Sequence, residues 1–143
     1  MIMITLPGNP IALKRPRFFK GNVFNSQEKE MEETFWDIKW QMPKNIYGSS
    51  IAPLAGPLKV HIVFYMPIPP STPKPKKLRM SGQLHTKRPD IDNMIKWVLD
   101  CGNVAAWADD SIICHLSALK VYDSSPRTVI TIEEIGVANG QAD

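Results

Sequence analysis

The chain has 143 residues, 22% of them charged, and a formal net charge of +3 at pH 7. This length fits one domain that buries roughly two-thirds of the surface of its unfolded chain. Because no stretch of about 18 apolar residues and no secretory signal occur, we expect a cytoplasmic protein without membrane contact, in which Cys101 and Cys114 stay reduced.

The N-terminal segments predict a strand and a hairpin. Residues 1–6 form an alternating apolar run, which is typical of a strand, and the run Pro-Gly-Asn-Pro at residues 7–10 ends it. Residues 14–24 are expected to form a short hairpin that turns at Gly21-Asn22.

A helix is expected to follow, capped by Ser26 and ending near Met42. Trp36 and Trp40 lie on a stripe of this helix next to its apolar side. We interpret them as core or dimer-contact residues rather than as platforms for stacked bases, because such stripes usually pack. A loop rich in proline, glycine and serine spans residues 43–57. The apolar side of the helix carries Met31, Thr34, Phe35, Ile38 and Met42.

The middle of the chain predicts one clear strand and one long connection. Residues 58–66 alternate apolar side chains with Lys59, His61 and Tyr65, the pattern of a half-buried strand. Residues 67–89 are rich in proline and basic side chains and lack apolar periodicity, so we expect a mobile arm that orders on DNA. A proline-rich ligand for a partner domain is the alternative.

The C-terminal part predicts two antiparallel strands, at residues 112–122 and 127–134, joined by a turn at residues 123–126. Residues 136–143 are expected to be a frayed tail. Together the elements predict a compact α/β (α+β) domain over residues 1–135, in which a small mixed sheet packs with about two principal helices.

The segment at residues 88–110 contains the candidate site. Pro89 disfavours helix before it, and Asp92 is the predicted N-cap of a short helix. The helix is expected to stop at Cys101-Gly102-Asn103, with Gly102 at a positive φ.

Carboxylates and a lysine gather along this helix. Asp92, Lys96 and Asp100 fall on one side, and Asp90 lies just upstream of Asp92. Mg²⁺ is usually held by one or two carboxylates with water and phosphate oxygens, and it keeps neighbouring acids ionised. The alternative is that Asp90 and Asp92 only cap the helix and complement its dipole, and that Asp109-Asp110 only marks a turn.

The run RPDIDNMIKWVLD at residues 88–100, followed by WADDS and the strand-like IICHLSALKVY, resembles the RusA family of Holliday-junction resolvases. The family pattern is a basic lead into D-x-D-N-x-x-K, a helix that ends in an aspartate, W-x-D-D and a strand. The opening ITLPGNPIALKRPRF is also similar to the family's first strand and basic loop. The matching positions are Asp90, Asp92, Asn93, Lys96, Asp100, Trp107, Asp109 and Asp110.

The resemblance implies a nuclease, common in phages, that cuts four-way DNA junctions in recombination and repair. It implies a homodimer that uses Mg²⁺, for which Mn²⁺ can substitute. It assigns Asp90, Asp92 and Asp110 as catalytic, metal-binding acids and Lys96 as the functional lysine. The roles of Asp100 and Asp109 stay open.

Two basic segments accompany the candidate site and predict contact with a polyanion such as DNA. The alternative is that these basic loops only keep the protein soluble. The predicted DNA-binding residues are Lys14, Arg15, Arg17, Lys74, Lys76, Lys77, Arg79, Lys87 and Arg88.

Two other functions remain open from the residues. A non-catalytic protein that binds DNA junctions would keep the basic segments but would not need the three metal-binding aspartates. A metal-dependent nuclease for flaps, forks or RNA would keep the acids but prefer another substrate.

Overall fold

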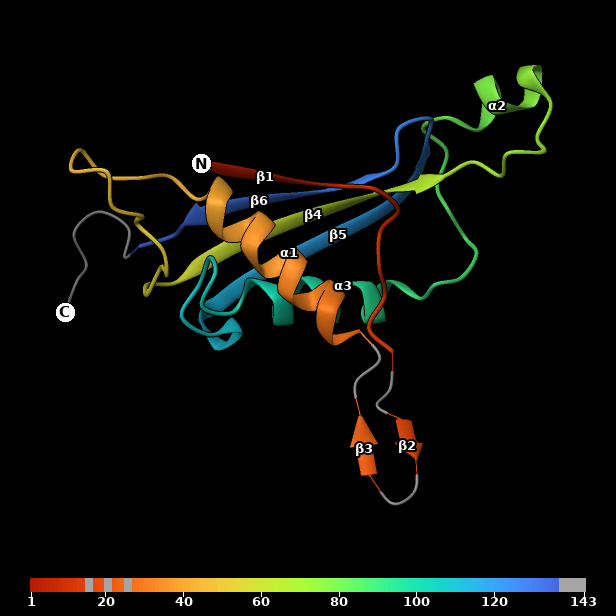
Figure 1. Cartoon of the computed structure of the whole chain (residues 1–143). Coiled ribbons are helices and arrows are strands. Elements are labelled where there is room, and N and C mark those ends of the chain that lie inside the picture. Colours follow the sequence, from red (N-terminus) through yellow and green to blue (C-terminus); the bar gives the residue numbers. More distant parts are fainter. Residues whose placement is uncertain (15–16, 20–21, 25–26, 137–143) are drawn as a thin grey trace.

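The protein folds as a four-stranded sheet with helices α1 and α3 on one face and the short helix α2 set apart from it (Figure 1). The structure, a computed structural model, describes residues 1–14, 17–19, 22–24 and 27–136. The elements are, in chain order, β1 (Ile2–Pro7), β2 (Arg17–Phe19), β3 (Asn22–Phe24), α1 (Glu28–Gln41), β4 (Leu58–Pro67), α2 (Lys74–Met80), α3 (Ile91–Gly102), the 3₁₀ helix η1 (Asp110–Ile112), β5 (Ile113–Asp123) and β6 (Arg127–Glu134).

The sheet is mixed, with the strand order β1-β6-β4-β5. β6 runs antiparallel to both β1 and β4, whereas β5 runs parallel to β4. A parallel pair needs a long crossover connection, and residues 68–112 provide it here. This connection contains α2, α3 and η1, so every candidate carboxylate lies in the segment of chain that links β4 to β5. The mixed sheet and its helices confirm the predicted fold class.

One part of the predicted topology is wrong. β5 and β6 are consecutive and antiparallel in direction, as expected, but they do not pair with each other, because β4 lies between them. Ile62 of β4 is in register with Ala118 of β5 on one side and with Ile130 of β6 on the other. As the most regularly buried strand, β4 gains backbone partners on both edges when it takes this inner position.

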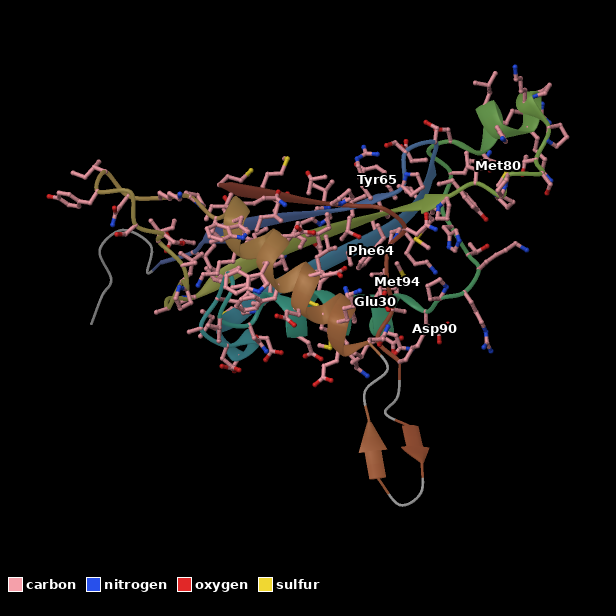
Figure 2. The ribbon with its side chains drawn as sticks, in the orientation of Figure 1. Glu30, Phe64, Tyr65, Met80, Asp90 and Met94 are labelled. Atoms are coloured by element: carbon pink, nitrogen blue, oxygen red, sulfur yellow. The ribbon has the colours of Figure 1, made fainter. Side chains whose placement is uncertain are left out.

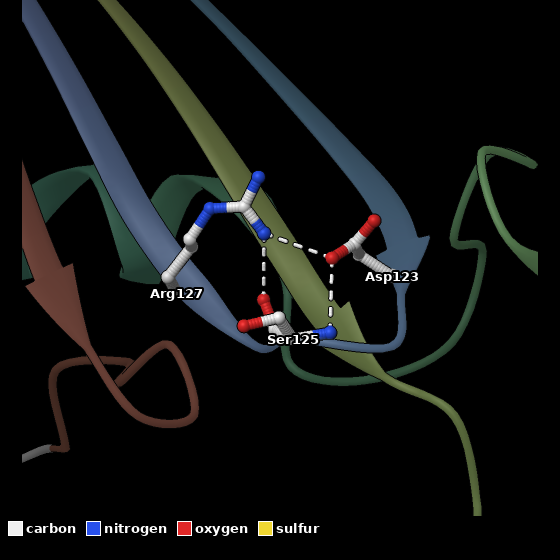
Figure 3. Close-up of polar contacts among 3 residues, drawn as sticks. All are labelled: Asp123, Ser125 and Arg127. Atoms are coloured by element: carbon white, nitrogen blue, oxygen red, sulfur yellow. Dashed lines mark hydrogen bonds and ion pairs between the residues drawn. The ribbon is translucent and has the colours of Figure 1, made fainter.

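The turn between β5 and β6 is closed by the Asp123 carboxylate (Figure 3). Its Oδ2 atom accepts hydrogen bonds from the backbone N–H of Ser125 at 2.9 Å and from Arg127 Nη1 at 2.8 Å. The bond from Ser125 and the nearby Arg127 hold the pKa of Asp123 below its ordinary value. The guanidinium of Arg127 also lies 3.8 Å from the centre of the Tyr65 ring. These contacts hold the outer ends of three strands together.

The core lies between the sheet and the two long helices. Alternate β4 residues from Leu58 to Met66 are buried, while the residues between them are half-exposed, as the sequence predicts. Phe64 of β4 and Met94 of α3 are both fully buried members of this core (Figure 2). No helix in the described part of the chain has the length and apolar character needed to cross a membrane.

Helix α1 begins one residue after Gln27, and the predicted cap Ser26 lies outside the described residues. The predicted apolar side faces the core through Ile38 and ends at the buried Met42. Trp36 and Trp40, however, are 42% and 69% exposed, and their rings stack at a centroid distance of 5.8 Å. A core position for these two residues is therefore wrong, and their role as dimer contacts stays a prediction.

Two shorter elements were harder to predict. The antiparallel pairing of β2 with β3 confirms the expected hairpin. Asn22, predicted in its turn, instead pairs with Phe19 as the first residue of β3, and Gly21 lies outside the described residues. Helix α2, at Lys74–Met80, forms within the stretch that was expected to lack regular structure. Its proline, Pro75, lies in the first turn, where a missing N–H costs the helix nothing. The mobility of this arm stays a prediction.

Candidate active site

The start of α3 places two carboxylates at one end of a helix. The predicted N-cap, Asp92, is wrong: α3 begins at Ile91, and Asp90 takes the cap position with extended backbone angles. Pro89 restricts only Arg88 before it, and Asp90 itself has extended angles (φ −69°, ψ 139°) and is a preferred N-cap residue, so the helical angles begin at Ile91. The Asp90 side chain makes no capping hydrogen bond, and Asp92 Oδ1 accepts from the backbone N–H of Asn93 at 2.9 Å.

Asp90 and Asp92 line the same cleft, which has a volume of about 660 Å³. The cleft lies between residues 84–92 and the edge strand β5, and both carboxylates are exposed. Figure 2 shows Asp90 at the outer side of the segment that enters α3. The same cleft is lined by three cations, Lys87, Arg88 and Lys120. Acidic groups and basic groups therefore face one solvent-filled space.

Lys120 reaches this cleft from β5. Its Nζ donates hydrogen bonds to the backbone carbonyls of Lys87 at 2.7 Å and Pro89 at 2.5 Å. Burial lowers the pKa of Lys120, and the charge of Asp90 opposes that shift. Sequence reasoning missed this residue. The available signal was its position in the alternation of the strand: Lys120 stands two residues from both Ala118 and the buried Tyr122, so a cation lies on the same face of the strand as an apolar core residue.

Asp110 lies in a second charged group, near the other end of α3. It opens η1 and is half-buried. The pKa of Asp100 is raised above its ordinary value, first by burial and then by the charge of Asp110, while Lys96 opposes the shift. These three residues are thus close enough for their charges to interact.

Asp109 has a structural role in this group. Its Oδ2 atom accepts from the backbone N–H of Ser111 at 3.0 Å and so caps η1. Hydrogen bonding from the Ser111 side chain, and then from this backbone N–H, holds the pKa of Asp109 below its ordinary value. The Asp109 carboxylate therefore stabilises the turn in which Asp110 lies.

The structure brings Asp90 and Asp92 together but does not gather Asp110 with them. Asp92 and Asp100 are two helical turns apart on α3, about 12 Å along its axis. Among the residues that the structure describes, no group of three or more histidine, cysteine or acidic side chains converges to hold a metal ion. Lys96 belongs to the group of Asp100 and Asp110, one helical turn after Asp92 on α3. Joint binding of one ion by Asp90, Asp92 and Asp110 therefore stays a prediction.

The pair Asp90 and Asp92 nevertheless fits Mg²⁺ by its donor chemistry. Both residues offer hard carboxylate oxygens to solvent in one cleft. Mg²⁺ is usually held by one or two carboxylates and keeps several waters, so a pair is sufficient for a first binding position.

The loop between α3 and η1 is held by a buried tryptophan. Trp107 is fully buried, and its Nε1 donates to Asn103 Oδ1 at 3.0 Å. The predicted positive φ at Gly102 is wrong, because the positive φ of this loop falls on Val104. Gly102 instead lies against the Trp107 ring, where a side chain has no room. The backbone N–H of Ala108 donates to the Leu54 carbonyl at 2.8 Å, which fixes the approach to η1.

The predicted DNA-binding residues divide into two described groups. Lys87 and Arg88 are exposed beside the acidic cleft. Helix α2 carries Lys74, Lys76 and Arg79 as exposed side chains, together with the half-buried Lys77. Lys74 and Lys77 also line a separate, mostly apolar cleft of about 410 Å³ that holds none of the candidate acids. Lys14 is exposed, and the side chains of Arg15 and Arg17 lie outside the described residues.

Comparisons with known proteins agree with the sequence resemblance. A family model described as "Endodeoxyribonuclease RusA" matches residues 7–133. The chain is 28% identical over 141 residues to the uncharacterized protein YqaN of Bacillus subtilis (strain 168), a match that covers 94% of this chain and 96% of that protein. It is 35% identical over 94 residues to the crossover junction endodeoxyribonuclease rusA of Lactococcus phage r1t, covering 65% of this chain and 63% of that protein.

Proposed function

The chain belongs to the RusA endodeoxyribonuclease family, and from this premise we propose that it cuts four-way DNA junctions in a Mg²⁺-dependent reaction during recombination and repair. The observation that carries the proposal is the cleft in which Asp90 and Asp92 face solvent beside Lys87 and Arg88. A cleft of this kind suits a phosphodiester, because the cations offset the repulsion between the acids and the DNA backbone.

In this proposal Asp90 and Asp92 hold the ion, and Asp110 is the third predicted ligand. When bound, Mg²⁺, or Mn²⁺ in its place, supplies an activated water and stabilises the charge on the leaving oxygen. The exposed Lys96, one helical turn after Asp92 on α3, is proposed to neutralise the phosphate under attack. Lys87 and Arg88 bind the phosphates beside it and so set which bond faces the acids.

The arm extends the DNA-binding surface beyond the cleft. Lys74, Lys76, Lys77 and Arg79 all lie on α2, which Figure 1 shows well away from α3. Charges spread over this distance suit a branched DNA, whose arms leave the cleavage point in several directions. We propose that the arm contacts phosphates of a neighbouring duplex arm, in a sequence-independent manner.

Symmetrical cutting of a junction requires two active sites, and the described part of one chain supplies one cleft that contains both Asp90 and Asp92. We therefore propose a homodimer with a two-fold axis, which would present both clefts to opposite strands. The exposed, stacked Trp36 and Trp40 are candidates for its interface. The acids that surround them on α1 make this helix a poor surface for DNA.

The experiment that tests this function compares substrates at matched protein concentration. A labelled immobile four-way junction, a fork, a linear duplex and an RNA duplex are each incubated with Mg²⁺, Mn²⁺ or a chelator. We expect paired cuts across the junction that require the metal and are much slower on the other substrates. Junction binding without cleavage in either metal would instead identify a non-catalytic binding protein, and equal cleavage of forks or RNA would identify a different nuclease.

A further inference from the structure

The segment that leads into α3 is attached to the sheet in two different ways. Residues 82–85 run beside the edge strand β5 through backbone hydrogen bonds. In these, Gly82 donates to Tyr122, Tyr122 donates to Gln83, and His85 donates to Lys120. This backbone pairing ends at His85, five residues before Asp90.

From Thr86 to Pro89 the attachment depends on one side chain. Within the described part of the chain, the hydrogen bonds made by the backbone of these four residues are the two donated by Lys120 Nζ, to Lys87 and to Pro89. Both acceptors lie within three residues of Asp90. The Lys120 side chain is half-buried beneath them, so it is not an ordinary solvated lysine.

An ammonium group is well suited to this task. It carries three donors and no acceptor, so one lysine can hold two backbone carbonyls at the same time. Hydrogen bonds from a charged donor are stronger than those between neutral groups. With both carbonyls held, the backbone that enters the Asp90 position has little freedom to move relative to Asp92, which is fixed by the helix itself.

We propose that Lys120 is a positioning residue for the active site: by holding the Lys87 and Pro89 carbonyls it sets the place of the Asp90 carboxylate beside Asp92. The proposal rests on the proposed function only in so far as these two acids bind a divalent ion. Lys120 acts through the backbone and does not bind the DNA phosphate. Groups that orient metal ligands typically change metal affinity or activity about 10- to 100-fold when they are lost.

The test uses two substitutions and a matched control. Lys120→Met keeps the length of the side chain but removes the donors and the charge, whereas Lys120→Arg keeps both. Lys59→Met makes the same change on the neighbouring strand β4, at a half-exposed position outside the cleft. The first readouts need no catalysis: the affinity for Mn²⁺, and amide hydrogen exchange of residues 86–92.

For Lys120→Met we expect faster exchange of these amides and a Mn²⁺ affinity lowered about 10- to 100-fold. The single-turnover cleavage rate should fall by a similar factor, while junction affinity measured in Ca²⁺ stays close to wild type. Lys120→Arg should recover most of each loss, and Lys59→Met should change none of them. If Lys120→Met is unfolded at the assay temperature, Lys120→Gln replaces it, and a partial loss in the same readouts is expected.

Several outcomes would overturn the proposal. Unchanged exchange and Mn²⁺ affinity in Lys120→Met would show that the lysine does not place Asp90. A loss of junction affinity with an unchanged cleavage rate at saturating protein would make Lys120 a DNA-binding residue instead. If the wild-type protein cleaves no junction, the proposed function fails, but exchange and Mn²⁺ affinity still decide the role of Lys120.

Discussion

A Cβ atom added to Gly102 would lie 2.2 Å from Cζ2 of the Trp107 ring, far inside van der Waals contact. Gly102→Ala must therefore push the fully buried indole away from its hydrogen bond to Asn103. We expect the variant to lose about 1–3 kcal/mol of unfolding free energy, measured by urea denaturation. Gly56→Ala is the matched control, because a Cβ atom there meets nothing within 4 Å. Equal stability of Gly102→Ala and wild type would contradict this packing.

Asp92→Asn should separate cleavage from binding. The substitution removes a carboxylate from the proposed metal-binding pair without changing the size of the side chain. We expect the junction cleavage rate to fall about a thousandfold or more, because an ion contributes several kcal/mol to the transition state. Binding of the uncut junction, measured by gel shift, should persist or tighten, since one negative charge near the phosphate is gone. Asp37→Asn, on the exposed side of α1, should leave both properties unchanged, and cleavage by Asp92→Asn at the wild-type rate would remove Asp92 from the reaction.

Asp100 predicts a pH dependence of stability. Burial and the charge of Asp110 raise its pKa above the ordinary value of 3.8, so the folded protein binds this proton more tightly than the unfolded chain does. The group therefore stabilises the fold below its ordinary pKa, and this contribution is lost as pH rises through the raised pKa. Asp100→Asn removes the disfavoured charged form. We expect it to be more stable than wild type at pH 7, by urea denaturation, with the difference shrinking toward pH 3. A difference that is constant from pH 3 to 7 would contradict the raised pKa.

Lys76→Ala and Arg79→Ala test the arm. Each removes one exposed positive charge from α2, away from the acidic cleft. We expect weaker junction binding for any DNA sequence, and a slope of log affinity against log salt that is smaller by about one for each substitution. The cleavage rate at saturating protein should stay near wild type. Lys44→Ala, in the loop after α1, is the control, and an unchanged salt slope in the α2 variants would place the arm outside the DNA contact.

The elements with strong periodicity could be predicted from the sequence because their burial pattern is local. β4 alternates and α1 repeats at helical spacing, and both lie close to the expected bounds. The neighbour of β5 could not be predicted in this way. Whether Ala118 lies beside β4 or β6 depends on contacts between distant segments, and no property of residues 112–134 alone decides it. Helix α2 was missed because its seven residues bury no side chain and so leave no apolar repeat.

The candidate site was predictable only in part, for the same reason. Asp90 and Asp92 are two residues apart, so their closeness could be expected from the local sequence, whereas the cleft that they share with β5 could not. Lys120 comes from a strand 30 residues later, and only the three-dimensional register places it under Pro89. Gly102 was assigned to a turn, the usual role of a glycine after a helix, although its actual constraint is the tryptophan ring above it.

The parallel register of β5 against β4 sets the position of two parts of the candidate active site. Lys120 lies on β5 and η1 directly precedes this strand, so the register in which Lys120 pairs with Phe64 also determines the position of η1. If β5 shifted by two residues along β4, each of its side chains would still face the same side of the sheet. Lys120 and Asp110 would nevertheless both move about 6–7 Å along the strand direction. Burial of the correct face of β5 is thus not enough for the proposed activity. Substitutions of buried β4 residues that loosen this alignment should lower the cleavage rate although they change no polar group.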